Sequence, residues 1–330
     1  MEGFLYNQAE WLLANYEIEI HEVNKGRGTY ICETTNGKKV LVPFRGSKEK
    51  GELLRENLRQ LEKTGFVVEQ IELNKDGEAV TEDENTGERF VLKNYIEGTE
   101  LNTERLEEMK EAVKVLAIFH NASAKMEQTV SKGLLRESVL ENCKKHNREL
   151  LKAKNYIRSR KKRSEFEQIY LKNFEKNKKQ AEQSLQILEQ AEASVQSHNM
   201  FCHGDFNQHN IVLMNGRYQM INFENFSYQW AMTDLDNFLR KMLEKNNWDE
   251  RVGKELIGTY ESYRRMEKCE YVQLHGLLLF PEKLWKVTNH YMNSRKTWIS
   301  SKEIGKLKRV MEQEEQRLNF MENIFSFRKE

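Results

Sequence analysis

Only two prolines, Pro43 and Pro281, interrupt the 330 residues, and glycine is sparse. Proline breaks helices and glycine opens turns, so a chain poor in both has little room for flexible linkers. Most of the chain must therefore lie in regular elements. The long periodic segments after about residue 100 favour helix for the larger part.

Extended segments are concentrated in the first hundred residues. Alternating, β-branched and aromatic patterns predict five strands, at 17–23, 29–35, 38–44, 66–73 and 88–96. Asn36-Gly37 lies between the second and third of these runs, and this dipeptide is the strongest short signal of a hairpin. Leucines at 53, 54, 58 and 61 predict one inserted helix, which stops at Gly65.

From about residue 103 the pattern is helical. We expect helices at 103–123, within 138–194, and at 234–246, 249–268, 271–296 and 301–326, with a weak strand pair around 211–223. Ser164 and Glu167 have the spacing of a capping box, so a helix restarts there. The expected architecture is α+β: a small antiparallel-sheet lobe over residues 1–97, then a larger, mainly helical lobe over 98–330.

Composition supports no particular class of charged partner. Lysines and arginines (53) nearly balance aspartates and glutamates (52), so no global field favours nucleic acid or an anionic membrane. The four cysteines, Cys32, Cys143, Cys202 and Cys269, lack metal-site or disulfide spacing and are typical of reduced cytosolic thiols. The N-terminus resembles no signal peptide, and no run of 18 apolar residues occurs. We expect a soluble protein made in the cytoplasm, without a membrane span or bound nucleic acid.

Five basic residues lie between Arg158 and Arg163, just before the expected helix start at Ser164. One interpretation is a solvated helix end, which is the commoner outcome for such clusters. The other is a contact for an anionic partner such as polyphosphate or another protein.

The string His203-Gly-Asp-Phe-Asn-Gln-His-Asn210 carries the clearest chemistry. A phosphotransferase needs an Asp that accepts the substrate's hydroxyl proton and, five residues on, an Asn that holds magnesium. Asp205 and Asn210 have this spacing, and Gly204 allows the tight turn before them. The alternative is a turn in which Asp and Asn only bond nearby backbone. The order of sheet lobe, hinge and helical lobe supports the first interpretation, with ATP and Mg²⁺ as cofactors.

Three further positions are candidates for nucleotide contact. Asn94 begins the expected hinge, which runs to Gly98. Gly26 and Gly28 lie between the first two strands, where a loop covering a nucleotide belongs, although a plain hairpin turn explains them equally well. His209 lies inside the loop and is either a residue that orients Asp205 or a phosphate, or a structural histidine.

The loop resembles the HGD(x4)N loop of aminoglycoside phosphotransferases and choline kinases. Downstream, four stretches of the sequence resemble those of the CotS-like spore coat family, at 234–249, 280–285, 289–293 and 296–298. The similarity runs from about residue 10 to residue 325. It implies a bilobal protein-kinase-like fold. It also implies a protein made in the mother-cell cytoplasm and deposited in the spore coat, with other coat proteins as partners.

The resemblance also exposes two departures. The family's second metal ligand is an Asp about a dozen residues after the loop Asn, where this chain has Asn222. An amide keeps one oxygen but removes a charge that magnesium prefers, and Glu224 is the candidate to supply it. The predicted metal ligands are therefore Asn210, Asn222 and Glu224.

The second departure is the third-strand lysine that grips nucleotide phosphates, because the best-aligned position holds Val42. Lys38, Lys39 or Arg45 are the candidates to replace it. Without a replacement, the helix glutamate that usually pairs with this lysine, Glu52 or Glu56, has no partner.

Losing one preorganised electrostatic group costs about 100-fold to 1,000-fold in rate, and two independent losses about 10,000-fold to a million-fold. The sequence therefore predicts a coat-assembly component with weak or absent phosphotransferase activity, a pseudokinase that binds nucleotide at most as a structural ligand. The alternative is an active ATP-dependent kinase of small molecules or proteins. Phe280, Trp285, Tyr291 and Trp298 recur at helical spacing, which is typical of core packing. The alternative is an exposed set that lines a substrate region or presents a protein-binding patch.

Overall fold

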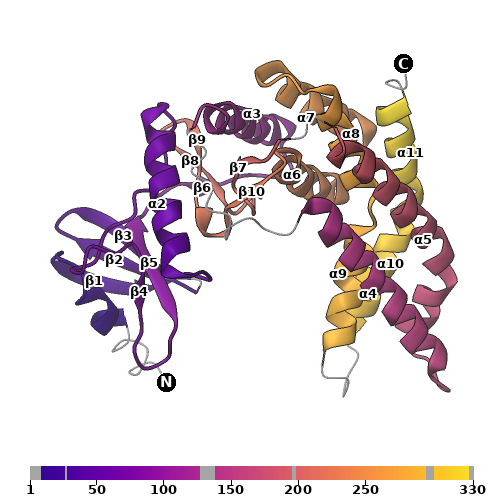
Figure 1. Cartoon of the computed structure of the whole chain (residues 1–330), viewed down its shortest axis with the longest axis horizontal. Helices are drawn as coiled ribbons and strands as arrows, with labels where there is room; N and C mark the ends of the chain where they lie inside the picture. The colour runs from indigo at the N-terminus through magenta and orange to yellow at the C-terminus, as the bar shows by residue number, and fades with distance from the viewer. Residues whose placement is uncertain (1–8, 27, 127–137, 195–197, 295–300, 327–330) are drawn as a thin grey trace. The chain divides into compact units, whose positions relative to one another are not determined.

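A computed structural model describes residues 9–26, 28–126, 138–194, 198–294 and 301–326. The chain forms two compact units, Met1–Leu134 with Met200–Tyr228, and Leu135–Asn199 with Gln229–Glu330. The first contains the antiparallel sheets and the second is helical, which confirms the predicted α+β class (Figure 1). The first unit extends beyond residue 97 to Leu134, and it also includes the segment 200–228 with the HGD loop.

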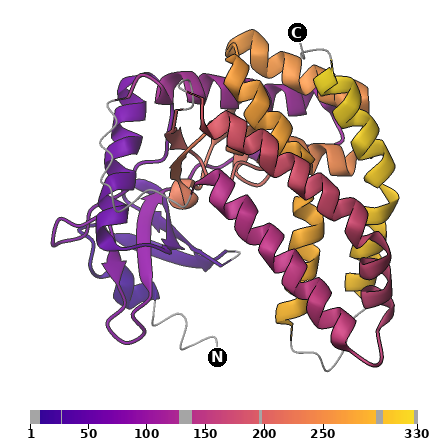
Figure 2. The ribbon, with the colours of Figure 1, turned by 45° about the vertical axis from the view of Figure 1, so that its right-hand side comes forward.

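The main sheet of the first unit has five antiparallel strands in the order β1-β2-β3-β5-β4. They are β1 (Ile20–Lys25), β2 (Tyr30–Thr34), β3 (Gly37–Pro43), β4 (Thr81–Glu82) and β5 (Arg89–Asn94). Figure 2 shows these indigo to purple strands from a second direction. The hairpin predicted at Asn36-Gly37 is confirmed, since Thr34 pairs with Gly37 and Gly37 has a φ of 88°. In β3 and β5, Val40 lies opposite Lys93 and Val42 opposite Val91.

The prediction of a strand at 66–73 is wrong. This segment contacts β5 through an isolated bridge between Ile71 and Lys93 and through two further backbone bonds, but it does not continue a ladder. The fifth strand is instead the two-residue β4, which pairs with the start of β5. Alternation of apolar and polar residues cannot distinguish a ladder from an extended segment that touches the sheet at scattered points.

Helix α2 (Lys48–Lys63) is the predicted inserted helix. Ser47 caps it, because its hydroxyl accepts a bond from the Lys50 backbone N at 3.3 Å. The helix buries Leu54, Leu58 and Leu61 and ends before Gly65. These leucines recur at helical spacing, as the sequence predicted.

The rest of the first unit carries the HGD loop. It comprises β6 (Thr99–Glu100), α3 (Leu106–Ser123), β7 (Met200–Cys202), β8 (Ile211–Met214), β9 (Arg217–Met220) and β10 (Ser227–Gln229). The strands β8 and β9 confirm the pair predicted around 211–223. The buried ring of Phe119 on α3 contacts Phe66, Phe201 and Phe223, with centroids 5.7, 6.0 and 5.7 Å away. This aromatic core supports the chain on both sides of the loop.

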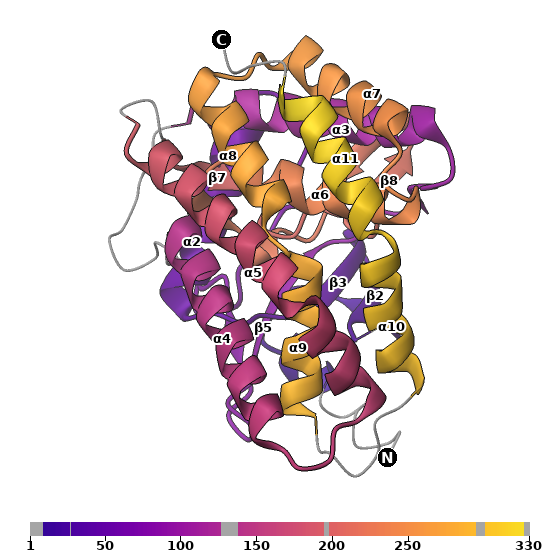
Figure 3. The ribbon, with the colours of Figure 1, turned by 90° about the vertical axis from the view of Figure 1, so that its right-hand side faces the viewer.

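The second unit is built from helices, and Figure 3 shows them from a direction turned by 90° from that of Figure 1. They are α4 (Val139–Ser159), α5 (Glu165–Glu192), α6 (Met232–Lys245), α7 (Glu250–Tyr263), α8 (Lys268–Leu279), α9 (Glu282–Asn293), α10 (Ser301–Glu312) and α11 (Glu314–Phe325). The capping box at Ser164 and Glu167 is confirmed at the start of α5. The helix predicted over 271–296 is two helices, because Pro281 ends α8 and precedes α9.

Three of the four C-terminal aromatic residues are described, and two of these are core residues. Phe280 and Tyr291 are buried, and Tyr291 stacks on Phe166 with centroids 4.0 Å apart. Trp285 is half-buried and lines a cavity of about 360 Å³ between α4 and α9, where its indole N–H donates to Glu149 at 2.7 Å. Trp298 and the string 296–298 lie outside the described residues.

The basic cluster lies at the turn between α4 and α5. Arg160 forms an ion pair with Glu167 at 2.6 Å, and Arg163 donates to the carbonyls of Ile157 and Arg158. Arg163 therefore satisfies carbonyls at the end of α4, whereas Arg160 ties the turn to the start of α5. Lys161 and Lys162 are exposed, so an anionic partner at this turn stays a prediction.

All four cysteines are buried free thiols. Burial raises the pKa of Cys32 to about 11 and that of Cys143 to about 12, from an ordinary value of 9.0. Since only the thiolate reacts, we expect iodoacetamide at pH 8 to alkylate both at least about 100-fold more slowly than in the unfolded chain. Peptide mass spectrometry with and without guanidinium measures this ratio, and equal rates would contradict the burial.

Among the described helices, none combines the length and apolar character needed to span a membrane.

Candidate functional site: a kinase-like loop with an internal lysine

The HGD loop joins β7 to β8 through a turn that only glycine fits. Gly204 has a φ of 78°, and a Cβ atom there would lie 2.0 Å from the carbonyl oxygen of Asn225. His203 is fully buried, and its Nε2 bonds the Ile221 carbonyl at 2.9 Å. Its Nδ1 accepts the backbone N–H of Asp205 at 3.3 Å. These bonds require the tautomer protonated at Nε2 and fix where the loop turns.

Two amides orient the half-buried side chain of Asp205. Asn207 Nδ2 donates to Oδ1 at 3.0 Å, and Asn210 Nδ2 donates to Oδ2 at 3.3 Å and to the Asp205 carbonyl at 2.8 Å. The predicted catalytic carboxylate is therefore held by side chains and not by backbone alone. This arrangement suits a base that must point in one direction.

Asn222 follows β9 in the left-handed conformation, with φ 66° and ψ 58°, which asparagine tolerates better than most residues. Its backbone N–H donates to Glu69 Oε2 at 2.8 Å. Its Nδ2 donates to Asn210 Oδ1 at 3.0 Å. The two predicted metal-binding amides therefore bond each other directly.

The lysine of this site is Lys93, on β5. Its Nζ lies 2.9 Å from Glu69 Oε1 and 3.0 Å from Asn222 Oδ1, and it forms a short ion pair with Glu224 Oε1. Lys93 is 1% exposed. Burial works to lower the pKa of Lys93, but the Glu224 and Glu69 carboxylates outweigh this and raise it, so the side chain stays an ammonium ion.

The predicted ligand oxygens do not fit a divalent ion in this arrangement. Asn210 Oδ1 accepts an amide hydrogen, while Asn222 Oδ1 and Glu224 Oε1 accept from Lys93. Magnesium needs oxygen lone pairs at about 2.0–2.1 Å in octahedral geometry. A second cation beside the ammonium would also be repelled.

The candidates to replace the third-strand lysine lie elsewhere. Lys38 pairs with Glu33 and Glu97 at the surface, and Arg45 is exposed. Lys39 is buried and bonds Glu72 and Asn94. None of these contacts involves Asn222 or Glu224.

The two helix glutamates that were predicted to pair with the nucleotide-binding lysine bond other groups instead. Glu52 accepts the backbone N–H of Ala79 at 2.5 Å, and Glu56 bonds Gln60. The carboxylate that pairs with the site's lysine is Glu69, in the segment after α2.

The remaining candidate residues are placed as follows. Gly26 and Gly28 close the β1–β2 turn, where the Gly26 N–H donates to Thr29 O at 2.8 Å, as in a plain hairpin. Asn94 ends β5, and its Oδ1 accepts from Lys39 at 2.5 Å. His209 Nδ1 contacts Glu100 Oε2 at 2.9 Å, so this ring is directed to the β6 side chain. Nucleotide contact by these residues stays a prediction.

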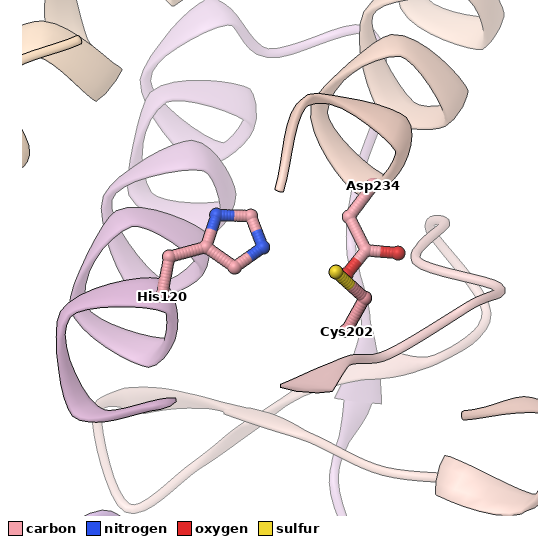
Figure 4. Close-up of side chains that lie close together, drawn as sticks. All are labelled: His120, Cys202 and Asp234. Atoms are coloured by element: carbon pink, nitrogen blue, oxygen red, sulfur yellow. The ribbon is translucent and has the colours of Figure 1, made fainter. Parts of the chain in front are cut away.

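Figure 4 shows three fully buried ionisable side chains that lie outside this arrangement, His120, Cys202 and Asp234. His120 is on α3 and Cys202 on β7, in the first unit, whereas Asp234 is in the first turn of α6, in the second. Because they are divided between the units, we assign no site to them.

A family model described as "Spore coat putative kinase YutH" matches residues 9–324, almost the whole chain. The chain belongs to the YutH family. This confirms the resemblance to CotS-like coat proteins that the C-terminal strings indicated. Among curated proteins, none matches this YutH-family chain.

Solved structures confirm the kinase-like fold of the YutH-family chain. An aminoglycoside phosphotransferase from Alicyclobacillus acidocaldarius is similar with a TM-score of 0.82 and 16% identity, over 96% of this chain and 95% of that one. A spectinomycin phosphotransferase in complex with ADP and spectinomycin has a TM-score of 0.67 and 14% identity, over 96% and 98%. The amicoumacin kinase hAmiN, in complex with AMP-PNP, Ca²⁺ and Ami, has a TM-score of 0.64 and 15% identity, over 97% of this chain and 96% of that one. At such identities the likeness shows the fold alone.

Sequence reasoning missed Lys93 and Glu69. Lys93 stands in an apolar run, Phe90-Val-Leu-Lys93, and Glu69 in another, Phe66-Val-Val-Glu69. A charged residue at a position where the strand pattern expects burial was the available signal, because buried charges need partners. The partners of Lys93 lie 24 to 131 positions away in the sequence, so only the folded structure could identify them.

Proposed function

We propose that this YutH-family chain is a spore coat component that works in coat assembly through contacts with other coat proteins, and that its phosphotransferase activity is weak or absent. The observation that supports the second part is the state of the site. The oxygens of Asn222 and Glu224 that would hold magnesium accept bonds from Lys93. The family membership supports the first part.

A second observation supports weak phosphate binding at this site. Val42 lies opposite Val91 in the sheet, where it offers a nucleotide no charge. Lys93 lies on the adjacent strand β5, but its three ammonium donors already have three acceptors. A nucleotide that binds this chain would therefore act as a structural ligand and would not be turned over.

An active ATP-dependent kinase is the second candidate, and one observation favours it. The carboxylate of Asp205 is held by Asn207 and Asn210, as a catalytic base should be. If the chain is an active kinase, its function requires the Asp205 carboxylate. If the chain works in assembly, its function does not require this carboxylate. The two candidates therefore differ in what one substitution does.

The deciding experiment compares spores of a deletion strain complemented with the native gene, with Asp205→Ala or with nothing. If the chain works in assembly, the deletion strain is expected to lose coat proteins from its coat extract, and Asp205→Ala restores them as well as the native gene does. Immunoblots of each strain control for the amount of protein. If Asp205→Ala is folded and present but behaves like the deletion, the kinase candidate replaces this proposal.

Calorimetric titration with ATP, with and without Mg²⁺, tests the state of the site in the purified chain. We expect Mg²⁺ to change the affinity for ATP by less than about 2-fold, because the ligand oxygens are already bonded. A micromolar affinity that Mg²⁺ strengthens at least about 10-fold would contradict the proposal, since that difference corresponds to a specific metal contact.

A further inference from the structure

Asn222 and Asn210 are arranged as partners of each other. Where two amide or carboxylate oxygens hold a metal ion, both point toward the cation. Here the Asn222 side chain presents its NH₂ group to Asn210 Oδ1 at 3.0 Å and its oxygen to Lys93. An aspartate at position 222 would face Asn210 with an acceptor against an acceptor, so only the amide satisfies both groups without a cation between them.

Lys93 completes the same set of bonds. An ammonium group has three N–H donors, and the three acceptors within reach are Glu69 Oε1, Glu224 Oε1 and Asn222 Oδ1. The second oxygen of Glu69 accepts the backbone N–H of Asn222 at 2.8 Å. Every donor of the ammonium group is therefore used within the first unit, and none is left for a phosphate.

The backbone fixes the ammonium group in this place. Lys93 lies on β5, which pairs with β3 on one side and β4 on the other, and its partner on β3 is Val40. Its side chain is 1% exposed, and that of Glu69 is 4% exposed. Moving the ammonium group aside would leave two carboxylates unpaired in a buried environment, which is costly. A metal ion would have to displace a cation that is covalently part of the sheet.

From these contacts we propose that Lys93, together with the Asn222 amide, takes the place that a divalent metal ion holds in a kinase-like site. The centre formed by Lys93, Glu69, Asn222, Glu224 and Asn210 is then complete without metal. The inference deepens the proposed function, because it rests on the same site and gives the reason for its weak turnover. It is independent of whether the chain works in coat assembly.

The test is direct binding of Mn²⁺, as a probe for divalent ions, to the full-length chain, followed by the electron paramagnetic resonance signal of the free ion. The native chain is expected to form no one-to-one complex at about 1 mM Mn²⁺. The variant Asn222→Asp keeps Lys93, which pairs with the new carboxylate, and is expected to behave like the native chain. The double variant Lys93→Met/Asn222→Asp regains an open carboxylate set and is expected to bind Mn²⁺ at least about 10-fold more tightly.

Asn210→Ala in the double variant is the control for ions on surface carboxylates, and it should abolish the regained binding. The native chain decides the proposal even where the double variant does not fold. A one-to-one native complex that Asn222→Ala abolishes would overturn it, and so would Asn222→Asp binding Mn²⁺ as tightly as the double variant. The spore complementation has no bearing on this readout, so failure of one proposal is distinguishable from failure of the other.

Discussion

Replacing Lys93 with methionine is expected to lower the free energy of unfolding by about 3 to 5 kcal/mol, because it leaves the buried Glu69 carboxylate and the half-buried Glu224 carboxylate without their cation. Methionine keeps most of the volume of the side chain, so the loss reports charge and hydrogen bonding and not a cavity. The partners left behind are Glu69 and Glu224, at 4% and 16% side-chain exposure. Guanidinium unfolding followed by circular dichroism measures the change.

Two further variants show whether the loss comes from this cluster. Lys38→Met removes an equivalent charge from a neighbouring strand, where the side chain is 40% exposed, and should leave the unfolding midpoint unchanged. The double variant Lys93→Met/Glu224→Gln should recover part of the loss, because it removes one of the two unpaired charges. If Lys93→Met costs less than about 1 kcal/mol, the ammonium group is solvated in solution and the cluster does not exist as described.

Gly204→Ala is expected to cost about 2 to 5 kcal/mol, because left-handed backbone disfavours any Cβ atom and this one would also overlap a neighbour. The new Cβ would lie 2.0 Å from the Asn225 carbonyl oxygen, which belongs to backbone and cannot rotate away. The expected consequence is a shifted HGD loop as well as a less stable chain. Thermal unfolding measures the stability.

Gly216→Ala is the matched control for the HGD glycine. Gly216 has nearly the same φ, 74°, but a Cβ atom there would meet nothing within 4 Å. It should cost only the backbone penalty, about 1 to 2 kcal/mol. Equal losses in the two variants would show that the close approach of Gly204 to Asn225 does not constrain the loop.

Some features of this chain could be predicted from short stretches of sequence because the physics that forms them is local. Asn36-Gly37 makes its turn within four residues, and Ser164 caps a helix with a residue three positions away. Asp205 and Asn210 contact each other across five positions inside one loop, so their spacing alone predicted their proximity.

Other expectations failed where a non-local partner decided the outcome. Residues 66–73 have the composition of a strand, but they contact β5 at scattered points while β4 takes the ladder position. The helix predicted over 271–296 lost its continuity at Pro281. The lysine of the site was sought on β3, next to Val42, and lies on β5 instead.

The sequence by itself determined the α+β class, the family, the HGD loop and the departures at Val42 and Asn222, because patterns and motifs are written in neighbouring residues. Only the tertiary structure decided what those departures mean. It brings Lys93 against Asn222, 129 positions away, and so places a cation where the sequence indicated only a missing charge. The physical reason is that a buried ion is defined by its partners, and partners from β5, from the segment after α2 and from the turn after β9 meet only when the chain folds.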